Sequence, residues 1–170
     1  MSDYYIYQDQ LRCIGCRACE MHCKTENDVP VGASFCKIIP VGPAVKEDVP
    51  RIQFIFMPCF HCEAPWCVSA CPTGAMQKRA KDGIVSVDKE ICIGCKACIT
   101  ACPWGAPQWN YDSGTALKCH YCVHRVDQGL EPACVAGCTT KALSWISPSE
   151  SSAVRRERWA LGISKERPVR

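Results

Sequence analysis

The sequence predicts an α+β fold in which two similar halves of short strands and short helices surround clustered cysteines. Three observations lead to this expectation. Cysteine supplies 17 of the 170 residues, and sixteen of these cysteines fall into four groups of four. The segments that follow three of the groups resemble one another, and strand-like runs stand before the groups. The repeating unit is therefore a strand, a cysteine loop, a short helix and a second strand.

The spacing of the cysteines favours a shared metal over disulfide bonds. Neighbours recur three residues apart, and cysteines this close suit one metal site better than a framework of bridges. The total is odd, and the first ten residues carry neither an apolar signal run nor a twin arginine. No stretch reaches the roughly 18 apolar residues of a membrane span. We therefore expect a soluble protein in a reducing compartment, the cytoplasm.

The four groups differ in their internal spacing. Two groups have the spacing C-x2-C-x2-C-x3-C: Cys13, Cys16, Cys19 and Cys23, then Cys92, Cys95, Cys98 and Cys102. The group with the spacing C-x2-C-x4-C-x3-C is Cys59, Cys62, Cys67 and Cys71. The group with the spacing C-x2-C-x11-C-x3-C is Cys119, Cys122, Cys134 and Cys138.

The run 92–102 has the spacing of bacterial ferredoxins, in which three cysteines bind one [4Fe–4S] cluster and the fourth completes another. Sixteen cysteines in such groups predict four [4Fe–4S] clusters. Zinc is the competing interpretation, because zinc sites prefer two C-x2-C pairs separated by a spacer. Only the group that begins at Cys119 approaches that pattern.

Each element follows from local signals. Strand-like runs lie at 4–7, 52–56 and 84–87, while Pro72 and Pro103 end the short helices that follow two groups. Prolines in 24–58 exclude a long helix, so we expect a Pro-rich loop insertion there. The basic residues of 147–170 predict a tail, either solvated or docked on a partner.

The predicted domain organisation has four parts. One half comprises 1–23 and 103–146, and the other half comprises 59–102. The insertion 24–58 and the tail 147–170 complete the chain. The formal charge of +3 counts thiols as neutral, so the cluster-bound protein is negative, and we expect no nucleic-acid binding.

Residues beside the ligands have expected roles too. We expect Ile14, Val68, Ile93 and Ile99 to pack around the clusters and exclude water, which tunes the reduction potential. The seventeenth cysteine, Cys36, is expected to be a small buried apolar residue. Four histidines are expected near the ligands or on the surface: His22, His61, His120 and His124. No nucleotide-binding or catalytic motif is present, so we predict no catalytic site.

The order of the groups, the long gap 24–58 and the x11 interval resemble the iron–sulfur subunit family of dimethyl sulfoxide reductase type, over roughly residues 3–146. The resemblance implies that ligands are exchanged between groups, which gives four ligand sets. Set I is Cys13, Cys16, Cys19 and Cys138. Set II is Cys23, Cys119, Cys122 and Cys134. Set III is Cys71, Cys92, Cys95 and Cys98. Set IV is Cys59, Cys62, Cys67 and Cys102.

The resemblance also implies a row of clusters and a function. The chain is expected to be a non-catalytic electron-transfer subunit between a large molybdenum or tungsten catalytic subunit and a second redox subunit. Aldehyde oxidoreductase and formate dehydrogenase types are the candidate catalytic partners. A flavoprotein, a ferredoxin or a membrane quinone subunit is the candidate second partner. Two copies of the row are expected to be able to join end to end.

Three alternatives stay open. A free-standing soluble polyferredoxin carrier would need no dedicated complex. A zinc-binding interaction module would use the same cysteines without electron transfer. Export together with a partner subunit is the alternative to a cytoplasmic location.

Overall fold

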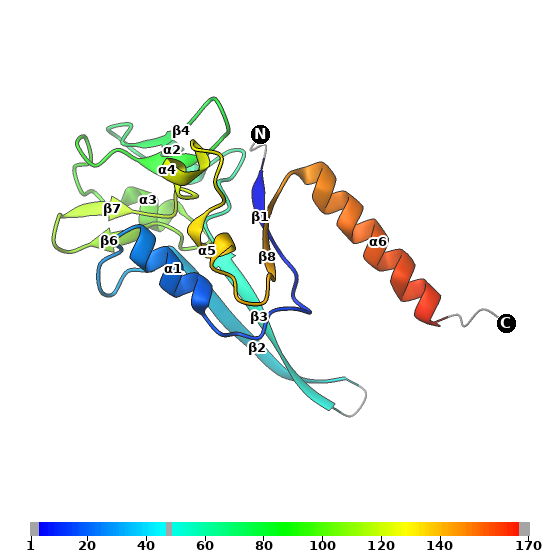
Figure 1. Cartoon of the computed structure of the whole chain (residues 1–170). Helices are drawn as coiled ribbons and strands as arrows, with labels where there is room; N and C mark the ends of the chain where they lie inside the picture. The colour runs from blue at the N-terminus through cyan, green and yellow to red at the C-terminus, as the bar shows by residue number, and fades with distance from the viewer. Residues whose placement is uncertain (1–3, 47–48, 167–170) are drawn as a thin grey trace.

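The computed structural model describes residues 4–46 and 49–166 (Figure 1). Its elements are short except for one hairpin and two helices. The strands are β1 (Tyr5–Gln8), β2 (Cys36–Lys46), β3 (Val49–Pro58), β4 (Met76–Lys78), β5 (Val85–Val87), β6 (Gln108–Asn110), β7 (Thr115–Leu117) and β8 (Leu143–Ile146). The helices are α1 (Ala18–Glu26), α2 (Trp66–Ser69), α3 (Ala97–Ala101), α4 (Val123–Val126), α5 (Ala133–Ala136) and α6 (Pro148–Glu166). The expected α+β class is confirmed.

The strands pair two by two in antiparallel order: β1 with β8, β2 with β3, β4 with β5, and β6 with β7. The β1–β8 pair joins distant parts of the sequence, from Tyr5 opposite Ile146 to Gln8 opposite Leu143. The same pairing lets α1 pack against α5. It therefore brings the first cysteine group beside the last one.

Two apolar cores share the two central hairpins. The larger core contains Ile84 and Leu117, whereas the smaller one contains Val85 and Ala116. Because successive strand residues point to opposite faces, one step along the chain moves a side chain from one core to the other. The hairpins β4–β5 and β6–β7 thus join the two parts of the molecule.

The segment 24–58 has more regular structure than the expected loop. After α1 it forms the β2–β3 hairpin, the longest pairing in the described chain, with a register shift between Val41 and Ala44. Its prolines do exclude a long helix, as expected. Phe54 and Phe56 of β3 pack on the larger core, so the hairpin base belongs to the body of the protein.

The segment expected to be a tail forms α6, which leads away from the other elements in Figure 1. A capping box begins this helix: the Ser147 backbone N–H donates to Glu150 Oε2 at 2.7 Å, and the Glu150 N–H donates to Ser147 Oγ at 3.3 Å. Arg158 holds the helix to β1 through Tyr7 Oη at 3.1 Å and through Asp9. Within residues 4–46 and 49–166, no helix is both long and apolar enough to cross a membrane.

Candidate metal centres

Each C-x-x-C loop turns through a left-handed residue just before its second cysteine. That residue is Gly15 (φ 70°), His61 (φ 46°), Gly94 (φ 70°) or Tyr121 (φ 51°). Glycine adopts this conformation without a steric penalty, but histidine and tyrosine need support from their surroundings. The four loops therefore share one backbone shape although their sequences differ.

The third cysteine of each group is the second residue of a helix. This holds for Cys19 in α1, Cys67 in α2, Cys98 in α3 and Cys134 in α5. Three of these helices have only four or five residues, and the fourth cysteine then lies beyond the helix end. The x3 step thus carries the last thiol of a group away from the first three.

The members of set III line one cavity together. Its walls include Cys71 from one group and Cys92, Cys95 and Cys98 from another. Burial raises the pKa of Cys98 to about 11, with further contributions from Cys71, Cys92 and the neighbouring Cys67. Thiols from two cysteine groups therefore converge on one cavity.

The other predicted sets also show close members from different groups. Burial raises the pKa of Cys19 to about 12, and the charges of Glu20, Cys138 and Cys13 add to it, which places parts of set I together. Burial raises the pKa of Cys134, with contributions from Cys119 and Cys23 of set II. Burial likewise raises the pKa of Cys67, and Cys59 and Cys102 of set IV contribute.

Electrostatic contributions of the same kind also link thiols of different sets. Cys19 of set I acts on Cys134 of set II. Cys59 of set IV acts on Cys119 of set II. Cys67 of set IV acts on Cys98 of set III. Each successive pair in the order I, II, IV, III thus has one such contribution between its thiols.

Each set contains a thiol that accepts an N–H···S hydrogen bond. The donors are Ala142 N to Cys138 (3.2 Å), Asn27 Nδ2 to Cys122 (3.5 Å), Met76 N to Cys71 (3.4 Å) and His61 N to Cys59 (3.5 Å). Such bonds favour a thiolate over a neutral thiol, because the donor stabilises the negative sulfur. They are also one of the factors that set the potential of an iron–sulfur cluster.

The donor chemistry fits iron–sulfur clusters. Thiols as basic as Cys19 and Cys98 keep their protons at neutral pH, whereas metals bind the thiolate. Bound iron supplies the positive charge that ionises a coordinating thiol. Among the described residues, no three or more His, Cys, Asp or Glu side chains form a group placed to hold a single metal ion.

Two of the four apolar residues expected to pack around the clusters are buried less than expected. Val68 and Ile99 pack on the smaller, cysteine-containing core as expected. Ile14 and Ile93, however, are 63% and 67% exposed, so neither is buried, although Ile93 lines the same cavity as the cysteines of set III. Both follow the first cysteine of a C-x-x-C loop, and the outward turn of that loop directs them to solvent.

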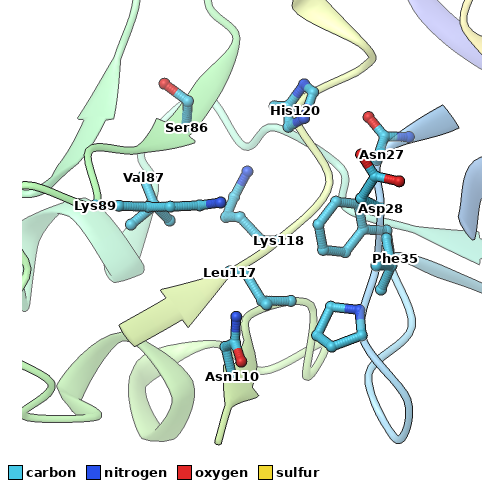
Figure 2. A pocket seen from close by; sticks show the side chains of 12 residues that line it. Asn27, Asp28, Phe35, Ser86, Val87, Lys89, Asn110, Leu117, Lys118 and His120 are labelled. Carbon is cyan, nitrogen blue, oxygen red and sulfur yellow. The ribbon is translucent and has the colours of Figure 1, made fainter. Parts of the chain in front are cut away.

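Cys36, His120 and His124 lie near cysteines of set II. Cys36 is buried, as expected, and its Sγ is 3.9 Å from the Cys19 carbonyl oxygen. A hydrogen bond from Cys36 lowers the pKa of Cys23, against the effect of burial. His124 is half exposed and lies 2.8 Å from Glu26, whereas His120 lines the pocket in Figure 2.

Sequence reasoning missed a buried junction between sets II and IV. His61 from one loop and Tyr121 from the corresponding position of another lie with ring centroids 3.7 Å apart and ring planes tilted by 34°. Lys118, which lines the pocket in Figure 2, is only 2% exposed. The positions equivalent to His61 and Tyr121 in the other two loops are glycines, and that contrast was the available signal.

These features define the class of protein: four groups of cysteines, with thiols of different groups lining one cavity and N–H donors to sulfur, are typical of a multi-cluster iron–sulfur protein. Comparison with known proteins supports this. Models of the 4Fe-4S dicluster domain match residues 50–147 and residues 12–75.

Curated relatives cover most of the chain. A thiosulfate reductase electron transfer subunit of Salmonella typhi is 42% identical over 156 residues, which span 91% of this chain and 81% of that protein. A component of the anaerobic dimethyl sulfoxide reductase of Escherichia coli is 38% identical over 151 residues (85% and 73%). A component of the tetrathionate reductase of Salmonella typhimurium is 42% identical over 137 residues (79% and 54%).

The chain belongs to the 4Fe-4S dicluster family of dimethyl sulfoxide reductase-type iron–sulfur subunits. As a member it is a non-catalytic electron-transfer protein with four [4Fe–4S] clusters, and this replaces the zinc alternative. When bound, each cluster supplies a site that takes up and releases an electron.

Proposed function

We propose that the chain relays electrons along a row of four clusters, held by sets I to IV, between a molybdenum-containing reductase subunit and a second redox partner. The observation that supports a row is that thiols assigned to successive sets, in the order I, II, IV, III, raise one another's pKa values. A row of this kind connects two separated surfaces. A single pair of clusters would not.

The exposure of particular cysteines supports entry and exit at the two ends of the row. Cys16 in set I and Cys95 in set III are exposed, whereas all of set II is buried. Exposed Ile14 and Ile93 stand beside these two thiols. Apolar groups around a terminal cluster suit a contact that excludes water from the transfer path.

The names of the relatives guide the choice of catalytic partner. They include thiosulfate, dimethyl sulfoxide and tetrathionate reductases. We therefore propose a reductase of molybdenum type ahead of a tungsten aldehyde oxidoreductase or a formate dehydrogenase. A flavoprotein, a ferredoxin or a membrane quinone subunit would complete the path. A cytoplasmic location, end-to-end association and the four-part domain division stay predictions.

Anaerobic purification from the native cells tests the proposal. We expect about sixteen irons and about sixteen sulfides per chain, a brown colour that bleaches on reduction, and a large catalytic subunit in the same fractions. An iron content far below this would contradict the row of clusters. Iron-replete chain that always migrates alone would favour the free polyferredoxin carrier.

A further inference from the structure

Lys118 is a buried cation with no carboxylate partner. It directly follows β7 and directly precedes Cys119 of set II. Only 2% of the residue is exposed, and its Nζ donates to two backbone carbonyls, that of Cys119 at 2.6 Å and that of Val85. Asp28 lines the same pocket, yet within the described residues Lys118 forms no ion pair.

Burial of an ammonium group is costly unless negative charge compensates it. Two carbonyl dipoles satisfy its hydrogen bonds but carry no net charge. The nearby sources of negative charge are cysteine thiolates. Four thiolates outweigh the positive charge of a [4Fe–4S] core, so each cluster with its ligands is a net anion.

Lys118 is linked to the two inner sets, II and IV, by the backbone and by a short chain of hydrogen bonds. Its own backbone continues into Cys119 of set II. The Val85 carbonyl that it binds belongs to β5, and the Val85 N–H donates to His61 Nδ1 at 2.8 Å. The backbone N–H of His61 in turn donates to Cys59 Sγ of set IV at 3.5 Å. Val85 also packs against Cys67 of set IV in the smaller core.

The effect of Lys118 on nearby thiols agrees with this placement. Its charge lowers the pKa of Cys119, against the larger effect of burial. It acts in the same direction on the pKa of Cys67. The ammonium therefore favours negative charge on both sides of the junction.

We propose that Lys118 is the shared counter-charge of the two inner clusters and holds their reduction potentials above those that the cysteine ligands alone would give. This deepens the proposed function, because it rests on the assignment of sets II and IV. Reduction adds one negative charge to a cluster. A fixed cation nearby stabilises that reduced state, and the low local dielectric strengthens the effect. Lys118 therefore acts on electron transfer through the cluster potentials, since it is neither an iron ligand nor a contact to a partner.

The test compares neutral substitutions in the complete, cluster-bound chain. Lys118→Gln keeps N–H donors for the carbonyls but loses the charge, and Lys118→Met loses both. Lys118→Arg keeps the charge. The matched control is Lys89→Gln, which removes an exposed charge from the same pocket (Figure 2).

An anaerobic redox titration followed by electron paramagnetic resonance gives the four midpoint potentials. At a fixed ambient potential, we expect the reduced-to-oxidised ratio of two clusters to fall at least tenfold in both neutral variants, which is about 59 mV for a one-electron step. The other two clusters should shift less. Lys118→Arg and Lys89→Gln should stay near the unmodified protein.

Several results would overturn the inference. One is a neutral variant with full iron content and four unchanged potentials. Another is an equal shift of all four clusters, or a shift of the same size in Lys89→Gln. If the neutral variants fail to bind iron but Lys118→Arg binds it in full, the positive charge is needed, which supports the inference. If Lys118→Arg fails to bind iron as well, the site needs the shape of lysine and not its charge, which overturns the inference. A low iron content in the unmodified chain would instead contradict the proposed function.

Discussion

The exchange of ligands between groups gives a prediction about iron content in double variants. Cys67 and Cys71 belong to one group, four residues apart, yet they are assigned to sets IV and III. Cys98 lies in another group, although it shares a cavity wall with Cys71. Proximity in the sequence would pair Cys71 with Cys67, whereas Cys71 lines a cavity with Cys98, as the ferredoxin-type exchange of the fourth cysteine predicts.

The expected magnitude follows from the sets. Each [4Fe–4S] cluster contributes about four irons, so Cys71→Ala should lower the content from about sixteen to about twelve. Adding Cys98→Ala should remove nothing more, because the same cluster is already lost. Adding Cys67→Ala to Cys71→Ala instead should leave about eight irons.

Iron and acid-labile sulfide are measured per chain after anaerobic purification, with protein quantified by amino-acid analysis. The reasoning is refuted if the Cys71/Cys98 pair loses about eight irons while the Cys71/Cys67 pair loses about four. Set III suits this test because it is placed at one end of the proposed row. The larger core, which contains Cys19, Cys119 and Cys134, does not include its cysteines.

Three further predictions concern residues beside the clusters. Gly94→Ala places a Cβ 2.6 Å from the Gly114 carbonyl oxygen, so it should cost about 1–3 kcal/mol more than Gly74→Ala, which has the same left-handed φ but open space. Denaturant midpoints of the cluster-bound variants measure this difference. Cys36→Ala should keep about sixteen irons, because no ligand is lost, and iron analysis checks it. Asn27→Leu removes the Nδ2–H donors to sulfur, so redox titration should find one cluster at a more negative potential.

Each of these has an outcome that contradicts it. Equal midpoints for the two glycine variants would mean that the backbone near Gly114 yields without cost. A loss of about four irons from Cys36→Ala would make that cysteine a ligand. Unchanged potentials in the Asn27 variant would show that its amide does not affect the cluster electronically.

The cysteine pattern predicted much of the fold because it constrains local geometry. The strand runs at 4–7, 52–56 and 84–87 overlap β1, β3 and β5. The insertion and α6 were underestimated for different reasons. The β2–β3 hairpin depends on cross-strand pairing that no local signal specifies. The capping box at Ser147 and Glu150 is a local sequence signal for the start of α6, whereas the charge of the segment indicated only a tail.

Exposure and burial at single positions were harder to predict. Ile14 and Ile93 are apolar, yet the left-handed turns at Gly15 and Gly94 direct the loops outward. Lys118 is charged, yet it is buried. In both cases the surrounding backbone decides the environment of the side chain, and residue type alone misleads.

Amino-acid order alone was sufficient to establish the cofactor class, because thiols three residues apart suit one shared metal centre. It also established the number of clusters and the absence of a recognisable catalytic motif. Which thiols line one cavity and where a buried ammonium stands were decided only by the tertiary structure. The physical reason is that β1 pairs with β8 and α1 packs on α5 across the whole length of the chain, and such contacts depend on folding rather than on neighbouring residues.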